Sequence, residues 1–85
     1  MTIKTLTGHG LRLVLDSAQI FPDDPGQGTP AMVYKGNASS TYWCACGEGE
    51  LLGPGCESVA LSQTQCNWLD AQEEAVSAFL EQHGD

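Results

Sequence analysis

SQTQCNWLDAQEEAVSAFLEQH, at residues 62–83, has the residue spacing of an amphipathic helix. Ser62 is a favourable N-cap residue, and Gln65 stands three positions later, which is the spacing of a capping box. Apolar residues then recur every three or four positions, which places them on one side of the helix: Trp68, Leu69, Ala75, Val76, Phe79 and Leu80. We therefore expect one helix at about 62–83 that packs its apolar side on a sheet.

The opposite side of this predicted helix is acidic. Asp70, Glu74 and Glu81 project together away from the apolar residues, whereas Glu73 lies near the edge of the apolar stripe. A solvated outer face is the usual reason for such charges on a surface helix. The alternative interpretation is that these carboxylates contact a partner with a basic surface.

Segments before the helix have the pattern of β-strands. Leu11–Leu15 is a short apolar run with one charge, which is typical of a half-buried strand. Ile3 and Leu6 indicate an earlier strand, with a turn at Gly8–Gly10. Ala31–Tyr34 is the next predicted strand.

A β-hairpin is predicted at residues 31–46. Ser40–Cys46 is rich in aromatic and β-branched residues, and Lys35–Ser39 supplies turn-forming residues between it and the preceding strand. Alternation along Ser40–Cys46 places Tyr42 and Trp43 on opposite faces of the sheet. One of these two aromatic side chains is then expected to face away from the helix.

Together these elements predict the α+β class. We expect a small antiparallel sheet of three or four strands, with one C-terminal amphipathic helix packed on one face. Glu50–Leu52 adds a short edge piece and Val59–Leu61 leads into the helix. A chain of 85 residues has room for one domain. That domain is 1–85, strand-rich over 1–61 and helical over about 62–83.

The segment PDDPGQGTP at residues 22–30 is predicted to be a loop. Its three prolines, two glycines and two aspartates are the residues that favour turns. Asp23 and Asp24 have the context of turn formation, and they are also candidates for contact with a partner. Long loops without regular structure often carry function.

Charge excludes several function classes. The net charge is −8, and Ser39–Asp85 contains no Lys or Arg. Such a field repels phosphate backbones, so we expect no direct nucleic-acid binding, but it attracts a basic protein. No segment approaches the roughly 20 apolar residues that cross a membrane. No signal peptide is recognisable at the N-terminus, so the expected location is the cytoplasm.

Four cysteines leave three interpretations open. Buried, reduced thiols are typical of a chain without a secretion signal. Tetrahedral zinc accepts four thiolates, but its sites usually use C-x2-C pairs. A disulfide from Cys56 to Cys44 or Cys46 is the third interpretation. If a metal binds, its ligands are expected to be Cys44, Cys46, Cys56 and Cys66.

We found no recognisable catalytic motif, so we expect no enzyme activity and no cofactor. The favoured hypothesis is a small acidic protein-interaction module, with homodimerisation as its simplest form. One alternative is an acidic decoy that imitates nucleic acid and inhibits a basic nucleic-acid-binding protein; another is a zinc or redox site on the cysteines. The candidate partner-binding residues are Tyr34, Tyr42, Trp43, Asp23, Asp24, Asp70, Glu74 and Glu81.

Overall fold

The structure is a computed structural model that describes residues 2–20 and 30–83. The strands in this part of the chain are β1 (Ile3–Gly8), β2 (Leu11–Asp16), β3 (Ala31–Lys35), β4 (Ala38–Thr41), β5 (Glu50–Leu52) and β6 (Ser58–Ala60). The helices are α1 (Tyr42–Glu48), α2 (Gln63–Ala71) and α3 (Glu73–His83), and a 3-10 turn, η1 (Ser17–Gln19), follows β2. Of the predicted loop at 22–30, only Pro30 is described, so Asp23 and Asp24 lie outside the described residues.

The strands form one antiparallel sheet in which each strand pairs with the next one along the chain. The predicted turn between β1 and β2 is confirmed. Its loop residues, His9 and Gly10, have φ angles of 52° and 81°, as a two-residue hairpin loop of type I′ requires. The described sheet has six strands, more than the three or four expected. The excess arises because β5 and β6 have three residues each, too few to show a clear alternation.

The prediction of a strand at residues 40–46 is wrong beyond Thr41. The hairpin of β3 and β4 pairs Lys35 with Ala38 and Met32 with Thr41, and α1 begins directly afterwards. Thr41 caps this helix, because its hydroxyl accepts a hydrogen bond of 3.2 Å from the backbone N–H of Cys44. Gly49, with φ of 70°, ends it. Local helix-capping chemistry thus overrides the strand propensity of the aromatic residues.

The C-terminal segment is helical as predicted, but it forms two helices. The capping box is confirmed: Ser62 Oγ accepts from Gln65 N at 3.1 Å, and Gln65 Oε1 accepts from Ser62 N at 2.9 Å. The helix is interrupted at Gln72, whose φ and ψ are −90° and 0°. Gln72 Nε2 donates to the carbonyl of Trp68 at 3.2 Å. Its backbone N–H donates to Leu69 O, three residues back, in a tighter turn.

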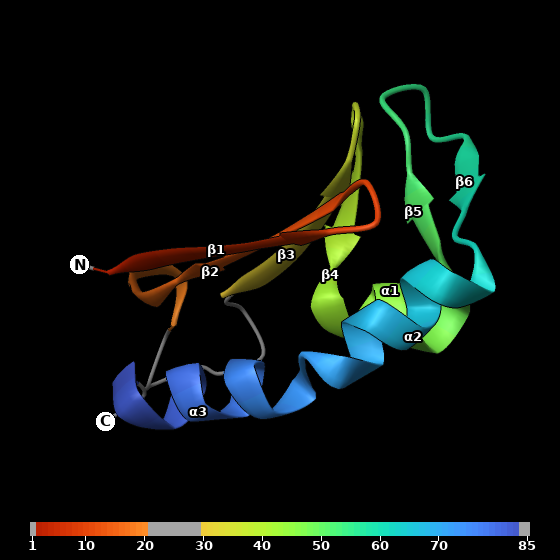
Figure 1. The fold of residues 1–85 in the computed structure, drawn as a ribbon. Helices are drawn as coiled ribbons and strands as arrows, with labels where there is room; N and C mark the ends of the chain where they lie inside the picture. The colour runs from red at the N-terminus through yellow and green to blue at the C-terminus, as the bar shows by residue number, and fades with distance from the viewer. Residues whose placement is uncertain (1, 21–29, 84–85) are drawn as a thin grey trace.

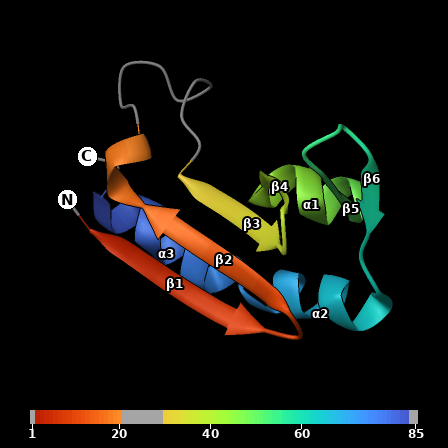
Figure 2. The same cartoon turned by 90° about the horizontal axis from the view of Figure 1, so that it is seen from above.

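The three helices cover one face of the sheet and leave the other face open (Figure 1). Seen from above, α3 runs beneath β1 and β2, α1 lies beside β4 and β5, and α2 lies near the β1–β2 turn (Figure 2). The predicted packing of the helical segment on the sheet is therefore borne out in its main feature. The N-terminal and C-terminal ends of the described chain lie on the same side of the molecule (Figure 1).

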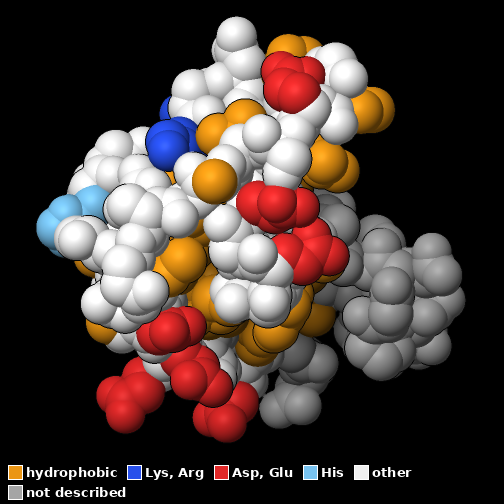
Figure 3. Space-filling model, turned by 90° about the vertical axis from the view of Figure 1, so that its right-hand side faces the viewer, with side chains coloured by type: hydrophobic (Ala, Val, Ile, Leu, Met, Phe, Trp, Pro, Cys, Tyr) orange, Lys and Arg blue, Asp and Glu red, His pale blue; other side chains and the backbone are white. Residues whose placement is uncertain are grey.

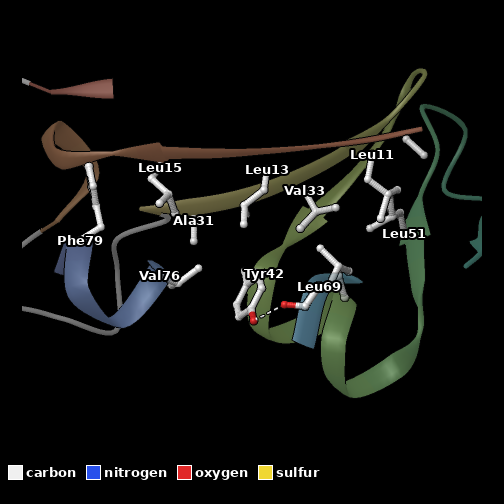
Figure 4. Close-up of a cluster of buried hydrophobic side chains, with 12 residues drawn as sticks. Leu11, Leu13, Leu15, Ala31, Val33, Tyr42, Leu51, Leu69, Val76 and Phe79 are labelled. Atoms are coloured by element: carbon white, nitrogen blue, oxygen red, sulfur yellow. Dashed lines mark hydrogen bonds between the residues drawn. The ribbon is translucent and has the colours of Figure 1, made fainter. Parts of the chain in front are cut away.

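The hydrophobic core lies between the sheet and the helices (Figure 4). Alternation along β2 points Leu11, Leu13 and Leu15 inward and leaves Arg12 exposed. The helices bury Leu69, Val76 and Phe79 against them, as the sequence spacing predicts. The remaining core residues are Ala31, Val33, Ala38, Tyr42, Ala45 and Leu51. Among the described helices, the longest has 11 residues, and none has the length and apolar character needed to span a membrane.

Candidate functional site

A crevice of about 290 Å³ opens between α1 and the segment formed by α2 and α3. Helix α1 contributes Tyr42, Trp43 and Cys46 to its lining. The other wall consists of Asp70 from α2 and, from α3, Glu73, Val76, Ser77 and Leu80. The crevice therefore combines an apolar lining with two carboxylates, and it depends on the packing of helices that the sequence does not predict as separate elements.

Tyr42 forms the buried part of this lining. Its side chain is 4% exposed, and its hydroxyl donates a hydrogen bond of 2.6 Å to the carbonyl oxygen of Leu69 (Figure 4). Burial raises the pKa of Tyr42, and the neighbouring Cys46 thiol and the charges of Glu73 and Asp70 raise it further. The phenol thus joins α1 to α2 and stays protonated at neutral pH.

Cys46 lies half-buried beside Tyr42. Burial raises the pKa of the Cys46 thiol above its usual value, and the neighbouring carboxylate of Asp70 acts in the same direction. The nearby Tyr42 hydroxyl lowers this pKa, by less than burial raises it. Because the thiolate is the reactive form of cysteine, the raised pKa lowers the reactivity of Cys46 at neutral pH.

Trp43 is the exposed aromatic residue of the crevice. Its side chain is 49% exposed, and its ring meets the ring of Tyr42 edge to face, with centroids 6.1 Å apart. The prediction that one of Tyr42 and Trp43 faces away from the helix, on the outer face of a strand, is wrong, because both residues are in α1 and both line the crevice. Because Tyr42 and Trp43 are consecutive residues of α1, their side chains point in different directions around that helix. Trp43 therefore lies in the helical layer and does not project from the open face of the sheet.

The acidic residues divide between the crevice and the outer surface. Asp70 lines the crevice as one of the predicted partner-binding residues, and Glu73 joins it. Glu74 and Glu81 are exposed on α3 but do not line the crevice. In Figure 3, acidic side chains lie along the lower edge of the molecule, where the helices are, with hydrophobic surface between them and further acidic side chains above.

The basic residues all lie on strands. Lys4 is in β1, Arg12 in β2 and Lys35 in β3, and these are the only Lys and Arg residues of the sequence. Helices α1, α2 and α3 therefore contain carboxylates without any Lys or Arg. This separation makes the helical side of the molecule the negative side.

Tyr34 belongs to a different surface from Tyr42 and Trp43. It lies on the open face of the sheet, where the guanidinium carbon of Arg12 stands 5.0 Å from the centre of its ring. A shallow hollow of about 310 Å³ beside it is lined by Val14, Asp16, Gln19 and Met32. The predicted partner-binding residues therefore do not form one continuous site.

The four cysteines are free thiols. Cys44 and Cys56 are exposed, whereas Cys46 and Cys66 are half-buried. Cys44 and Cys46 both lie in helix α1 and not in the strand that the predicted hairpin at 31–46 implied. Within residues 2–20 and 30–83, no cluster of three or more His, Cys, Asp or Glu side chains is suited to hold a metal ion.

Comparison with protein-family models, with curated proteins and with solved structures gives no match for this chain. Sequence reasoning missed Cys46, Val76, Ser77 and Leu80 as members of one crevice. The available signal was Thr41 as an N-cap residue with Gly49 as the terminating glycine, which together mark a seven-residue helix.

Proposed function

We propose that the protein is a non-catalytic interaction module that binds a basic partner protein through the crevice between α1 and α2–α3. The observation that carries this proposal is the position of Trp43, which is 49% exposed beside the carboxylates of Asp70 and Glu73. Exposed tryptophan residues are frequent anchors of protein interfaces. The carboxylates beside the tryptophan then favour a partner of positive charge.

The charge distribution supports a basic partner. The chain carries a net charge of −8, and its helices lack Lys and Arg, so the helical side attracts cations and repels nucleic acid. Complementary charge of this kind mainly increases the association rate and discriminates against acidic partners. We expect neither a membrane nor a nucleic acid to take part in this interaction.

The state of the thiols supports binding in preference to catalysis. The crevice contains one thiol, on Cys46, and its raised pKa keeps it protonated at neutral pH. A cytoplasmic location is part of the same proposal, because four free thiols are typical of a reducing compartment.

The test is capture of proteins from an extract of the organism that makes this chain. Wild-type protein, Trp43→Ala and Leu52→Ala are immobilised in parallel at low and at high salt. Leu52 is the matched control, since it is 56% exposed but lies in strand β5. We expect wild type and Leu52→Ala to retain the same basic proteins at low salt, and Trp43→Ala to lose them. Equal capture by all three proteins would show that the crevice is not the binding surface.

Self-association through the open sheet face is a second candidate. Ile3 in β1 and Leu52 in β5 are 60% and 56% exposed, and β1 and β6 are the edges of the sheet. Unpaired edges and apolar surface favour pairing with a second copy. Sedimentation velocity of wild type and of Ile3→Lys tests this candidate. If the dimer forms through the open face of the sheet, wild type should sediment as a dimer and Ile3→Lys as a monomer.

The decoy hypothesis predicts a different pattern of binding. A nucleic-acid mimic is recognised through its whole charged surface, so its complexes are weakened by salt but not by Trp43→Ala. Capture of DNA-binding proteins that is equal for wild type and Trp43→Ala would therefore favour the decoy over the crevice.

A further inference from the structure

We propose that the crevice receives an arginine side chain of the partner, with the guanidinium stacked on Trp43 and paired with the carboxylates of Asp70 and Glu73. This inference rests on the proposed function, because it names the chemical group that enters the same site. It goes further by excluding a lysine-selective site and a small-molecule site.

The first contact is with the indole of Trp43. This ring meets Tyr42 through an edge-to-face arrangement with an interplanar angle of 85°, and about half of the side chain is exposed to solvent. A cation above an aromatic ring is attracted by its electron-rich face, and tryptophan is the strongest of these acceptors. Arginine stacks on such a ring as a plane.

The second contact is with the carboxylates. Asp70 near the end of α2 and Glu73 at the start of α3 both line the crevice. Their negative charges both act on the hydroxyl of Tyr42, so their field extends into the floor of the crevice. A guanidinium has N–H donors in several directions of one plane, and it can stack on the indole while it donates to carboxylates beside it.

The third contact is with the apolar part of the lining. Leu80, which is half-buried, presents aliphatic surface at the crevice, and the buried Val76 and Tyr42 line its floor. The methylene stem of a long basic side chain packs well on such a surface while its charged end remains at the rim.

The size of the crevice supports one side chain as the occupant. Its volume of about 290 Å³ lies at the lower limit of the roughly 300–1,000 Å³ of pockets that hold whole small molecules. Lysine also has a long stem and a positive charge, but its compact ammonium is strongly hydrated and does not stack. The combination of tryptophan and two carboxylates therefore favours arginine.

The experiment is a titration of the ¹⁵N-labelled protein with acetyl-Gly-Arg-Gly-amide, followed by NMR in reducing buffer at low salt. The counterparts with citrulline, a neutral analogue of arginine, and with lysine are titrated in parallel. We expect saturable shifts of the Trp43 indole N–H and of the backbone N–H of Glu73 and Ser77. The dissociation constant should be on the order of millimolar, because a single side chain binds. The second indole signal, from Trp68, is an internal control outside the crevice.

The expected order of affinity is arginine, then lysine, then citrulline. Loss of stacking should weaken the lysine peptide about threefold, and loss of charge should weaken the citrulline peptide about fivefold. Asp70→Asn and Glu73→Gln should each weaken arginine binding about two- to fivefold. Glu74→Gln, which removes the same charge from the neighbouring exposed position outside the crevice, should change it less than about twofold, because that carboxylate makes no contact there and acts only through water.

Two results would overturn the inference: absence of saturable shifts at the crevice, or binding of the lysine or citrulline peptide as tightly as the arginine peptide. Either result combined with loss of partner capture by Trp43→Ala would remove the arginine assignment and keep the proposed function. Arginine-selective shifts combined with unchanged capture by Trp43→Ala would instead remove the proposed function.

Discussion

Gln65 Nε2 donates a hydrogen bond of 2.8 Å to the carbonyl oxygen of His9, which lies 56 positions earlier in the chain. The same side chain accepts from Ser62 N at 2.9 Å and from Lys35 Nζ at 3.4 Å. A nearly buried glutamine thus connects the β1–β2 turn, strand β3 and the start of α2. It fixes the position of α2, and with it the wall of the crevice that carries Asp70.

Replacement of Gln65 should therefore destabilise the whole domain. Gln65→Ala leaves the His9 carbonyl and the Ser62 N–H without these partners, so we expect a loss of about 1–3 kcal/mol in the free energy of unfolding. Gln65→Glu keeps the two acceptor roles but cannot donate to His9, and its loss should be smaller than that of Gln65→Ala. Denaturant unfolding measures both values. Gln63→Ala, at an exposed position of α2, is the control, with an expected change below about 0.5 kcal/mol.

Gly8 should not tolerate a larger residue. A Cβ at this position would lie 2.6 Å from Trp68 Cε2, which is an overlap. Overpacking of this kind typically costs about 1–3 kcal/mol, so Gly8→Ala should lower the free energy of unfolding by that amount. Trp68→Leu in the same chain should relieve part of the added cost, and a double-mutant cycle measures this coupling.

Gly47→Ala is the control for Gly8→Ala, and it should change the free energy of unfolding in the opposite direction. Gly47 is in α1, and no atom lies within 4 Å of a Cβ at this position. Alanine is a better helix former than glycine by about 0.5–1 kcal/mol, so this variant should be more stable than wild type. Equal destabilisation by Gly8→Ala and Gly47→Ala would contradict the packing of Trp68 on β1.

Stability should fall at alkaline pH because of Tyr42 and Cys46. The pKa of each is raised in the folded state above its ordinary value, 10.0 for tyrosine and 9.0 for cysteine. The folded chain therefore holds these protons more tightly than the unfolded chain. The free energy of unfolding should be unaffected by both groups below about pH 8, and it should fall as pH rises through the ordinary values towards the folded ones.

Tyr42→Phe separates this effect from general alkaline unfolding. The variant loses the hydrogen bond to Leu69 O, and we expect it to be about 0.5–1.5 kcal/mol less stable than wild type at pH 7. Its free energy of unfolding should decline less steeply than that of wild type above pH 10. Parallel pH profiles of the two proteins would be inconsistent with a raised Tyr42 pKa.

Thiol reactivity should divide the cysteines into two pairs. Cys44 and Cys56 are exposed, whereas Cys46 and Cys66 are half-buried, and the raised pKa of Cys46 further slows its reaction. A chromogenic disulfide reagent should therefore modify two thiols quickly and two slowly in the native protein, and all four at once in denaturant. Slow reaction of all four, together with metal in elemental analysis, would favour the zinc hypothesis instead.

Local patterns in the sequence predict part of this fold well. The capping box of Ser62 and Gln65 involves residues three positions apart, and the strand Leu11–Leu15 follows a simple alternation. Both are confirmed because the interactions that define them lie within a few residues. The burial of Val76 and Phe79 follows for the same reason from helical spacing.

The other parts of the fold depend on contacts between residues far apart in the sequence, or on helix caps that compete with local strand propensity. The segment beginning at Tyr42 has the composition of a strand, but Thr41 caps a helix there and Tyr42 bonds to Leu69, 27 positions away. The interruption at Gln72 comes from its own side chain and backbone geometry. The crevice was therefore not predictable as a unit, although Trp43 and Asp70 were named as separate candidates.

In the proposed function, Trp43 and the carboxylates beside it form the partner-binding surface. Amide hydrogen exchange of the protein, alone and in complex with a captured partner, tests this claim most directly. We expect slower exchange in the complex over Tyr42–Glu48 and over residues 73–80, with little change in β1 and β6. Protection confined to the strands of the open sheet face, with α1 unchanged, would contradict it.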